Sequence, residues 1–421
     1  MLIRDILLKQ AIIELIDNSI DGARTIREKN QFDGLEIKVS FNNEKFAIED
    51  NCGGIPLDVA ANYAFRFGRS NSRETTGKET TGIFGIGMKR ALFKIGNYFS
   101  IQSTTRTTTF QIDLDVETWV KNDDNNWDFQ FTSYDENMDN VYTGTKIEVT
   151  KLNPEISFEL GSDEFEKEVI DHIQRRVGLD IVHGIRITVN GKELMGNNVI
   201  MIDNDEIQPV KDEYLHEDVE VKIIAGISPR EGTKYLPEKA GWYIYCNGRL
   251  VVAADKTSLT TWKDMENKSS GVYFHNDYAA FRGVVHFNSN KPEKLPWNTT
   301  KTGIDESSVI YLKAKEKMLE VFKLMKAVFD EIKANTKECG DGMEETIANM
   351  SGKELTMEIA KTIAPNRRVD IQKVRVVTEP KVTITYKKLK KEADLLKESL
   401  GVRSYKEVGE KTFEYYMDAE C

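Results

Sequence analysis

The chain has 421 residues, of which 40% are hydrophobic and 30% charged, and its formal net charge is −11. At ~150 residues per domain this length predicts two or three domains, and the apolar content is sufficient for a sizeable buried core. The negative net charge argues against a protein that binds polyanions over its whole surface, although it is compatible with a local basic surface.

The cysteines and histidines indicate neither a disulfide framework nor a metal site. The four cysteines lie far apart and form no C-x-x-C pair, and the five histidines show no metal-ligand spacing. We therefore expect reduced thiols, as in cytosolic proteins. No apolar run approaches the ~18 residues of a membrane span, and we recognise no signal peptide. These features predict a soluble, cytoplasmic protein with no membrane partner.

Residues 5–29 are predicted to form one long helix. Glu14, Asn18 and Asp21 are spaced by four and then three residues, which places them on one face of that helix. Isoleucines beside them form an apolar stripe for packing into a core. Two carboxylates and an amide on one face could orient water and bind a hard cation. A solvated acidic helix face is the alternative interpretation of these residues taken alone.

A β-hairpin is expected next, with strands at residues 35–41 and 46–48. Its second strand leads to Asp50 and a loop that contains Gly53 and Gly54. Adjacent glycines permit positive φ and allow a ligand to approach the backbone. An aspartate at such a turn could accept a hydrogen bond from an exocyclic amine, although the loop taken alone is better explained as an ordinary turn with the aspartate as a local cap.

A glycine-rich segment precedes the next predicted helix, which starts near Met88. After a helical stretch at 58–67, residues 68–81 are polar and long enough for a lid. Gly82, Gly85 and Gly87 follow, at the entry to the helix. Backbone N–H groups at a helix N-terminus attract phosphate, and glycine lets the phosphate come close. The G-x-x-G-x-G order matches neither the Rossmann nor the P-loop pattern.

Further strands are expected at 98–103 and 107–113, and another begins with Gly144-Thr145. The Thr145 hydroxyl could line a base pocket, and a plain strand start is the alternative.

Taken in order, these motifs resemble those of the GHKL ATPase superfamily, which has the Bergerat fold. The motifs are E-x-x-x-N-x-x-D, D-x-x-G-G, a polar lid with G-x-x-G-x-G, and G-T, over residues 5–150. The superfamily includes type II topoisomerase B subunits, a heat-shock chaperone, sensor histidine kinases, MutL and MORC proteins. The wording of the first motif is most similar to the MORC and MutL branch. The resemblance implies an α+β protein whose ATP-binding domain is a two-layer α/β sandwich over residues 1–155.

The resemblance also implies a role for each matching residue, with ATP and Mg²⁺ as cofactors. Glu14 would be the general base that orients the attacking water, and Asn18 would coordinate Mg²⁺. Asp50 would bind the adenine amino group, with Thr145 in support. Gly54 would allow the base and ribose to approach.

The glycine motif would cradle the phosphates through the backbone N–H groups of Gly82, Gly85 and Gly87. One departure from the family pattern lies in the second motif, where Cys52 occupies the usual position of the first glycine. We expect Gly53 to compensate through a shift in the turn.

A transducer-like α/β domain is expected over residues 160–305. A helix at 164–176 and strands near 182–190, 218–226 and 281–288 are predicted there. Residues 242–252 form a strand–turn–strand that resembles the N-G-R strand of the MutL transducer.

Lys301 is the candidate phosphate-sensing lysine that the resemblance implies, because it follows a polar pair late in this segment. Lys291 and Lys294 are competitors, and a surface lysine in a loop is the alternative. Beyond it we expect a helical segment over 306–365. Residues 366–421 would form a small C-terminal tail of unassigned role, with a strand pair near 373–385.

The resemblance thus predicts Mg²⁺-dependent ATP hydrolysis that drives homodimerisation and rearrangement of the transducer. A MORC- or MutL-like ATPase acting on DNA or in a defence system is the favoured function. A chaperone-like ATPase and a non-hydrolysing nucleotide-binding scaffold are alternatives. A histidine kinase is disfavoured because no histidine precedes His172.

Overall fold

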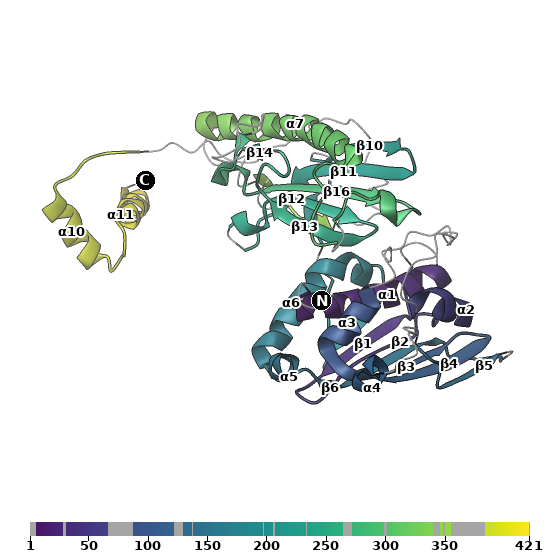
Figure 1. Cartoon of the computed structure of the whole chain (residues 1–421). Helices are drawn as coiled ribbons and strands as arrows, with labels where there is room; N and C mark the ends of the chain where they lie inside the picture. Colours follow the sequence, from purple (N-terminus) through teal and green to yellow (C-terminus); the bar gives the residue numbers. More distant parts are fainter. Residues whose placement is uncertain are drawn as a thin grey trace.

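The computed structural model describes the chain apart from residues 1–5, 28–30, 66–86, 122–128, 137, 197, 205–206, 233, 264–271, 299–300, 340–345, 348–349, 355–383 and 421. The described residues form two large β-sheets with helices packed on them and two small two-stranded sheets, followed by two C-terminal helices (Figure 1). Each of the two large sheets has its own hydrophobic core.

The first sheet has eight strands in the order β5-β4-β3-β6-β2-β1-β7-β8. Their bounds are β1 Glu36–Phe41, β2 Phe46–Asp50, β3 Gly96–Thr104, β4 Thr108–Asp115, β5 Ser133–Glu136, β6 Gly144–Leu152, β7 Arg186–Val189 and β8 Lys192–Glu193. The expected hairpin is formed by β1 and β2, and it pairs Ile37 with Asp50 at its open end. Asp50 therefore leaves the sheet where β2 ends.

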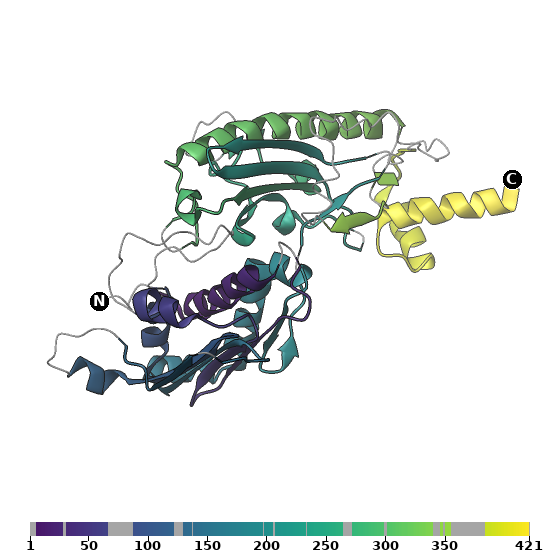
Figure 2. The same cartoon turned by 90° about the vertical axis from the view of Figure 1, so that its right-hand side faces the viewer.

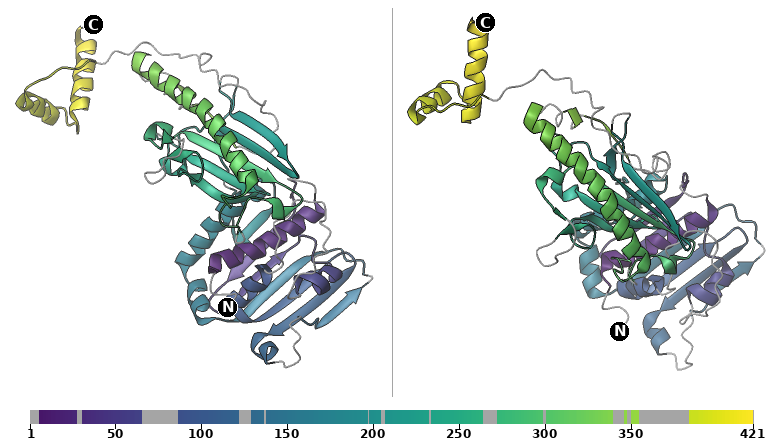
Figure 3. Two further views of the ribbon diagram at one scale, coloured as in Figure 1. Left: turned by 45° about the horizontal axis from the view of Figure 1, so that its top comes forward. Right: turned by 90° about the horizontal axis from the view of Figure 1, so that it is seen from above.

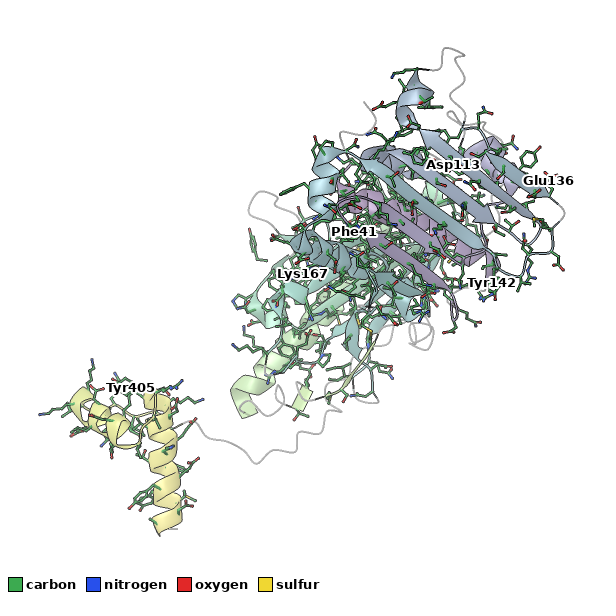
Figure 4. The ribbon with its side chains drawn as sticks, turned by 90° about the horizontal axis from the view of Figure 1, so that it is seen from below. Phe41, Asp113, Glu136, Tyr142, Lys167 and Tyr405 are labelled. Carbon is green, nitrogen blue, oxygen red and sulfur yellow. The ribbon has the colours of Figure 1, made fainter. Side chains whose placement is uncertain are left out.

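Helices cover one face of this sheet and leave the other to solvent. The helices are α1 Leu8–Ile26, α3 Gly87–Ile95, α5 Pro154–Leu160 and α6 Asp163–Val182, with the short α2 Leu57–Val59, the π-helical turn η1 Ala60–Ala64 and α4 Val116–Val120. Figure 2 shows α1 lying across the sheet. The view in Figure 4 shows the open face, where the strands carry Asp113 and Glu136. The alternation of buried and exposed residues along β1 fits this one-sided burial. The predicted α+β sandwich is confirmed.

The first sheet extends further along the chain than the sequence indicated. β7 pairs in parallel with β1, with Ile187 opposite Ile37. Ile173 of α6 and Leu194 belong to the core of the first sheet. This sheet and its core therefore continue to residue 194, beyond the boundary expected at residues 155–160.

The second sheet has the order β10-β11-β16-β12-β13. Its strands are β10 Val210–His216, β11 Val219–Ile227, β12 Gly241–Cys246, β13 Arg249–Asp255 and β16 Phe281–Asn288. The long helix α7, Val309–Cys339, lies along one face of it (Figure 2). Tyr311, Met318 and Met325 of α7 are fully buried, as the apolar spacing of three and four residues predicts.

Small elements complete the described part of the chain. They are β9 Ile200–Ile202, β17 Gly352–Glu354, β14 Trp262–Lys263, β15 Val272–Tyr273, the 3-10 turns η2 Pro237–Lys239, η3 Asn276–Tyr278 and η4 Pro292–Lys294, and the helices α10 Lys390–Ser399 and α11 Tyr405–Glu420. Figure 3 shows α10 and α11 beyond the end of α7. The strand pair expected near 373–385 falls almost entirely outside the described residues. No helix among the described residues is long and apolar enough to cross a membrane.

Candidate functional site

Helix α1 carries the first group of candidate residues. Its apolar side packs into the core of the first sheet, and its polar edge carries Glu14, Asp17 and Asn18. Figures 2 and 3 show the helix on the side of the first sheet that faces the second sheet. On this edge Glu14 is half-buried and Asn18 is exposed. Asp17, for which we predicted no role, is buried with 2% of its surface exposed. The helix therefore presents three polar side chains with different access to solvent.

Glu14 lies where three elements meet. Its Oε2 atom is 3.5 Å from Nζ of Lys301, which comes from the loop that precedes α7. A Cβ atom added to Gly87, the first residue of α3, would lie only 2.4 Å from the same Oε2. Only glycine fits at Gly87 without moving the Glu14 carboxylate. The structure thus brings together Glu14, Gly87 and Lys301 of the predicted site.

Lys301 is held in a constrained and buried position. Its φ is +53°, which is unusual for a residue other than glycine, and only 5% of its surface is exposed. Its Nζ also lies 5.9 Å from the centre of the Trp297 ring, within range of a cation–π contact. Burial lowers the pKa of Lys301, and the neighbouring Glu14 carboxylate partly offsets this effect.

The competing lysines are paired elsewhere. Nζ of Lys291 lies 2.9 Å from Asp218, and Nζ of Lys294 lies 2.7 Å from the same carboxylate and 3.0 Å from Glu217. These pairs occupy partly exposed surface on the β10–β11 turn, whereas Lys301 reaches α1. Of the three candidate lysines, Lys301 therefore lies beside Glu14, whereas the other two pair with carboxylates of the β10–β11 turn.

Asp50 forms the second part of the site, at the end of β2. Its Oδ2 accepts a hydrogen bond from the Ser19 hydroxyl at 2.6 Å. Its Oδ1 accepts from the backbone N–H groups of Cys52 at 2.9 Å and Thr145 at 3.2 Å. Burial raises the pKa of Asp50, while these three hydrogen bonds act in the opposite direction. Asp50 is therefore a half-buried acceptor that neighbouring donors fix in orientation.

Thr145 lies next to Asp50 and extends the polar network. Its hydroxyl is 3.0 Å from the Ser103 hydroxyl, and Ser103 accepts a hydrogen bond from the Ile55 backbone N–H at 2.7 Å. Sequence reasoning missed both Ser19 and Ser103. Ser19 directly follows Asn18 in the first motif and could have been found there, whereas no pattern in the sequence distinguishes Ser103.

The loop after Asp50 needs its glycines for backbone reasons. Gly53 and Gly54 both have positive φ, +99° and +74°. A Cβ at Gly54 would lie 2.1 Å from the Thr104 carbonyl oxygen, and one at Gly144 would lie 1.9 Å from that of Asp50. Only glycine therefore fits at positions 54 and 144.

Cys52, at the usual glycine position of the motif, is 1% exposed and belongs to the first core. Burial and the nearby Asp50 raise the pKa of its thiol. The side chain therefore contributes to packing beneath the loop.

Two further residues meet at the same edge of α1. Arg249, at the start of β13, donates a hydrogen bond from Nη1 to Oδ2 of Asp17, and the same Nη1 is 3.8 Å from Oε1 of Glu14. The second sheet thus supplies two cations, Arg249 and Lys301, to the carboxylates of α1.

The remaining candidates cannot be placed. Gly82, Gly85 and the predicted lid at 68–81 lie outside the described residues, while Gly87 begins α3. Within the described residues, no group of three or more His, Cys, Asp or Glu side chains could hold a metal ion. The groups present instead suit a nucleotide that brings its own cation: the half-buried Asp50 carboxylate as acceptor, a helix N-terminus, a lysine and the Asn18 amide.

Comparison with known proteins identifies the first part of the chain. Residues 6–145 match the family model described as "Histidine kinase-, DNA gyrase B-, and HSP90-like ATPase". The matched residues include Glu14, Asn18, Asp50 and Gly87 and end at Thr145. A comparison with curated proteins finds no match to this chain.

Proposed function

Residues 6–145 form a GHKL-type ATPase domain, and on this premise we propose that the chain binds ATP with Mg²⁺ and hydrolyses it between α1 and α3. The observation that carries this proposal is the convergence of Glu14, the first residue of α3 and Lys301. A carboxylate, a helix N-terminus and a buried cation are the groups that phosphoryl transfer to water requires.

Glu14 is the proposed general base. Its carboxylate is half-buried, and it lies beside the N-terminus of α3 at Gly87. A phosphate bound to the backbone N–H groups of that terminus would lie close to Glu14. Glu14 would then accept a proton from the water that attacks the terminal phosphate.

The adenine end of the proposed site is the network around Asp50. An exocyclic amine needs a hydrogen-bond acceptor, and the half-buried Asp50 carboxylate is one, held by Ser19 and two backbone N–H groups. Ser19 and Glu14 lie on the same helix, ~7.5 Å apart along its axis at 1.5 Å per residue. Helix α1 would therefore run alongside the nucleotide from its base towards its phosphates.

Asn18 is the proposed ligand of Mg²⁺. Its side chain is exposed on the edge of α1 between Glu14 and Ser19. When bound, the cation would neutralise charge on the phosphates and orient them. A single protein oxygen is sufficient, because Mg²⁺ in nucleotide sites is held largely by phosphates and water.

Lys301 is the proposed link between the nucleotide and the second sheet. A lysine at the terminal phosphate would neutralise charge that grows as the bond breaks. Since Lys301 belongs to the loop that precedes α7, its contact with phosphate would couple the nucleotide state to the position of the second sheet. We propose that this coupling drives dimerisation of two copies and a MORC- or MutL-like action on DNA or in a defence system.

Hydrolysis is tested by the rate of phosphate release from ATP with Mg²⁺ and after chelation of Mg²⁺. We expect turnover that disappears on chelation, and the absence of turnover with Mg²⁺ would overturn the proposed activity.

Dimerisation and DNA action are tested separately. Sedimentation velocity with a non-hydrolysable ATP analogue should show a dimer that the nucleotide-free chain lacks, and added duplex DNA should change the hydrolysis rate. Sedimentation as a monomer in both states, with a rate unaffected by DNA, would remove this part of the proposal.

A further inference from the structure

The turn between β12 and β13 lies against the helices of the first sheet. Asn247, which is 2% exposed, donates from Nδ2 to the Ser289 carbonyl and accepts from the Ser289 N–H, both at 2.9 Å. Gly248 has a φ of +81°, and a Cβ there would lie 3.0 Å from Nη2 of Arg24. The turn therefore lies close against α1 at Gly248 and is tied by Asn247 to the residue that follows β16.

A second set of contacts fixes the same strand. Nη1 of Arg176, on α6, donates to the carbonyl oxygens of Leu250 at 2.7 Å and Val251 at 3.1 Å. Arg24 also pairs with Asp180 of α6 at 2.8 Å. The first residues of β13 therefore pack against both α1 and α6.

This placement puts the Arg249 side chain beside the proposed base. Arg249 is 2% exposed, and so is Asp17, with which it forms an ion pair. The same guanidinium nitrogen lies 3.8 Å from Oε1 of Glu14, while Oε2 of Glu14 is 3.5 Å from Lys301. The two oxygens of the Glu14 carboxylate therefore face two different cations, and both cations come from the second half of the chain.

Glu14 and Asp17 contribute two negative charges here, and Arg249 and Lys301 contribute two positive charges. Burial lowers the pKa of Arg249 to about 10, with Glu14 partly offsetting the effect, so the guanidinium stays charged near neutral pH. Without Arg249 the buried Asp17 carboxylate would lose its ion pair, while Glu14 would keep its contact with Lys301. A buried carboxylate without a partner is strongly disfavoured, so Lys301 would be drawn towards the carboxylates and away from a phosphate.

We propose that Arg249 is a positioning residue for ATP hydrolysis: paired with Asp17 and bordering Glu14, it holds the base in place. The docked β12–β13 turn places this side chain beside α1, and hydrolysis then depends on the Arg249 guanidinium itself. This inference rests on the proposed function, since it takes Glu14 as the base.

The test compares kcat and KM for ATP in wild type, Arg249→Met and Arg249→Lys. For Arg249→Met we expect kcat to fall about 100-fold, as misplacement of a catalytic group can produce, with KM changed less than about 3-fold. The acidic limb of the kcat–pH profile should move to higher pH, because the carboxylate cluster has lost a cation. Arg249→Lys should restore part of kcat.

A double variant separates positioning from a purely structural role. Asp17→Asn combined with Arg249→Met removes both members of the buried ion pair and leaves no unpaired charge. If Arg249 positions Glu14, the double variant regains thermal stability but not kcat. Recovery of kcat together with stability would overturn the inference.

Arg24→Met is the matched control, because Arg24 lies against the same turn at Gly248 and also pairs with Asp21 and Asp180. Its kcat should stay within about 3-fold of wild type, and a loss equal to that of Arg249→Met would overturn the inference by making general docking the cause.

The failure of this inference and the failure of the proposed function give different results. Absence of turnover in wild type would overturn both, whereas wild-type turnover with an unchanged kcat in Arg249→Met would overturn only this one.

Discussion

Nζ of Lys301 lies 3.5 Å from Oε2 of Glu14, although the two residues are 287 positions apart in the chain. The contact joins the loop that precedes α7 to the first helix of the ATPase domain. The second sheet therefore does more than follow the nucleotide-binding domain along the chain, because it delivers a buried cation to the residue proposed as the base.

Replacement of Lys301 by methionine should reduce hydrolysis and leave nucleotide binding nearly intact. Removal of a group that stabilises transition-state charge lowers kcat by about 100-fold or more. The measurement is the steady-state rate at saturating ATP, beside the affinity for a fluorescent ATP analogue. Lys291→Met and Lys294→Met serve as controls, since both lysines pair with Asp218. Equal losses in all three variants would show that Lys301 has no special role.

Asp50→Asn should abolish tight ATP binding without unfolding the domain. Oδ1 would still accept from the Cys52 and Thr145 N–H groups, but the new amide nitrogen could not accept from the adenine amine. Loss of a hydrogen bond to a charged acceptor predicts a fall in affinity of about 10- to 100-fold. Titration with ATP measures it, and undiminished affinity would place the adenine elsewhere.

The direction of the stability change in Asp50→Asn can also be predicted. Burial raises the folded-state pKa of Asp50 above its ordinary value, so ionisation at neutral pH disfavours the folded state. This penalty is absent at a pH below the unfolded-state pKa and is complete above the folded-state pKa. Asp50→Asn should therefore be at least as stable as wild type at pH 7, as urea unfolding would show. If Asp50→Asn were clearly less stable than wild type, its binding defect would be explained by misfolding.

Gly54→Ala should destabilise the first domain more than alanine at an open turn. Both Gly54 and Gly191 have positive φ, +74° and +78°, but a Cβ at Gly54 would meet the Thr104 carbonyl at 2.1 Å, while nothing lies within 4 Å at Gly191. The left-handed conformation alone costs about 1–2 kcal/mol. Gly54→Ala should exceed that value in urea unfolding, and Gly191→Ala should not. Equal effects would contradict the close approach of this loop to β3.

His172, on α6, should make the folded chain sensitive to mild acid. Burial lowers its pKa from 6.5 to about 4, and the nearby Arg176, Lys9 and Arg175 add to the shift. The unfolded chain therefore takes up this proton at a higher pH than the folded chain. The stability contribution is complete above pH ~6.5 and is lost as the pH falls towards ~4.

His172→Gln should flatten the loss of stability between pH 7 and 4.5. The effect stays below the ~1.4 kcal/mol per pH unit of a fully linked proton, because the imidazole is partly exposed. Urea unfolding at several pH values measures it. His216→Gln, on β10, is the control, and identical pH profiles for wild type and His172→Gln would contradict the prediction.

Local patterns in the sequence predicted much of the site's framework. Spacing by three and four residues placed Glu14 on the helix that the structure has, and alternation predicted the hairpin that ends at Asp50. The glycine motif indicated a helix start near Met88, and α3 begins at Gly87. These features depend on neighbouring residues, so they can be read from short segments.

Long-range pairing was harder to predict. The parallel pairing of β7 with β1 extends the first sheet to residues that the sequence assigned to the second domain. The ion pair of Asp17 with Arg249 joins residues 232 positions apart and is buried, so no local pattern indicates it. Ser103 likewise joins the Asp50 network through strand register alone.

The central claim is that Glu14 is the base of an ATPase whose nucleotide lies along α1. The most direct test is the rate of phosphate release at saturating ATP by wild type and Glu14→Gln, with ATP binding measured in the same samples. The glutamine keeps the size and polarity of the side chain but removes the proton acceptor. We predict that Glu14→Gln hydrolyses ATP at least about 100-fold more slowly, with ATP affinity within about 3-fold of wild type. Hydrolysis by Glu14→Gln at the wild-type rate would contradict the claim.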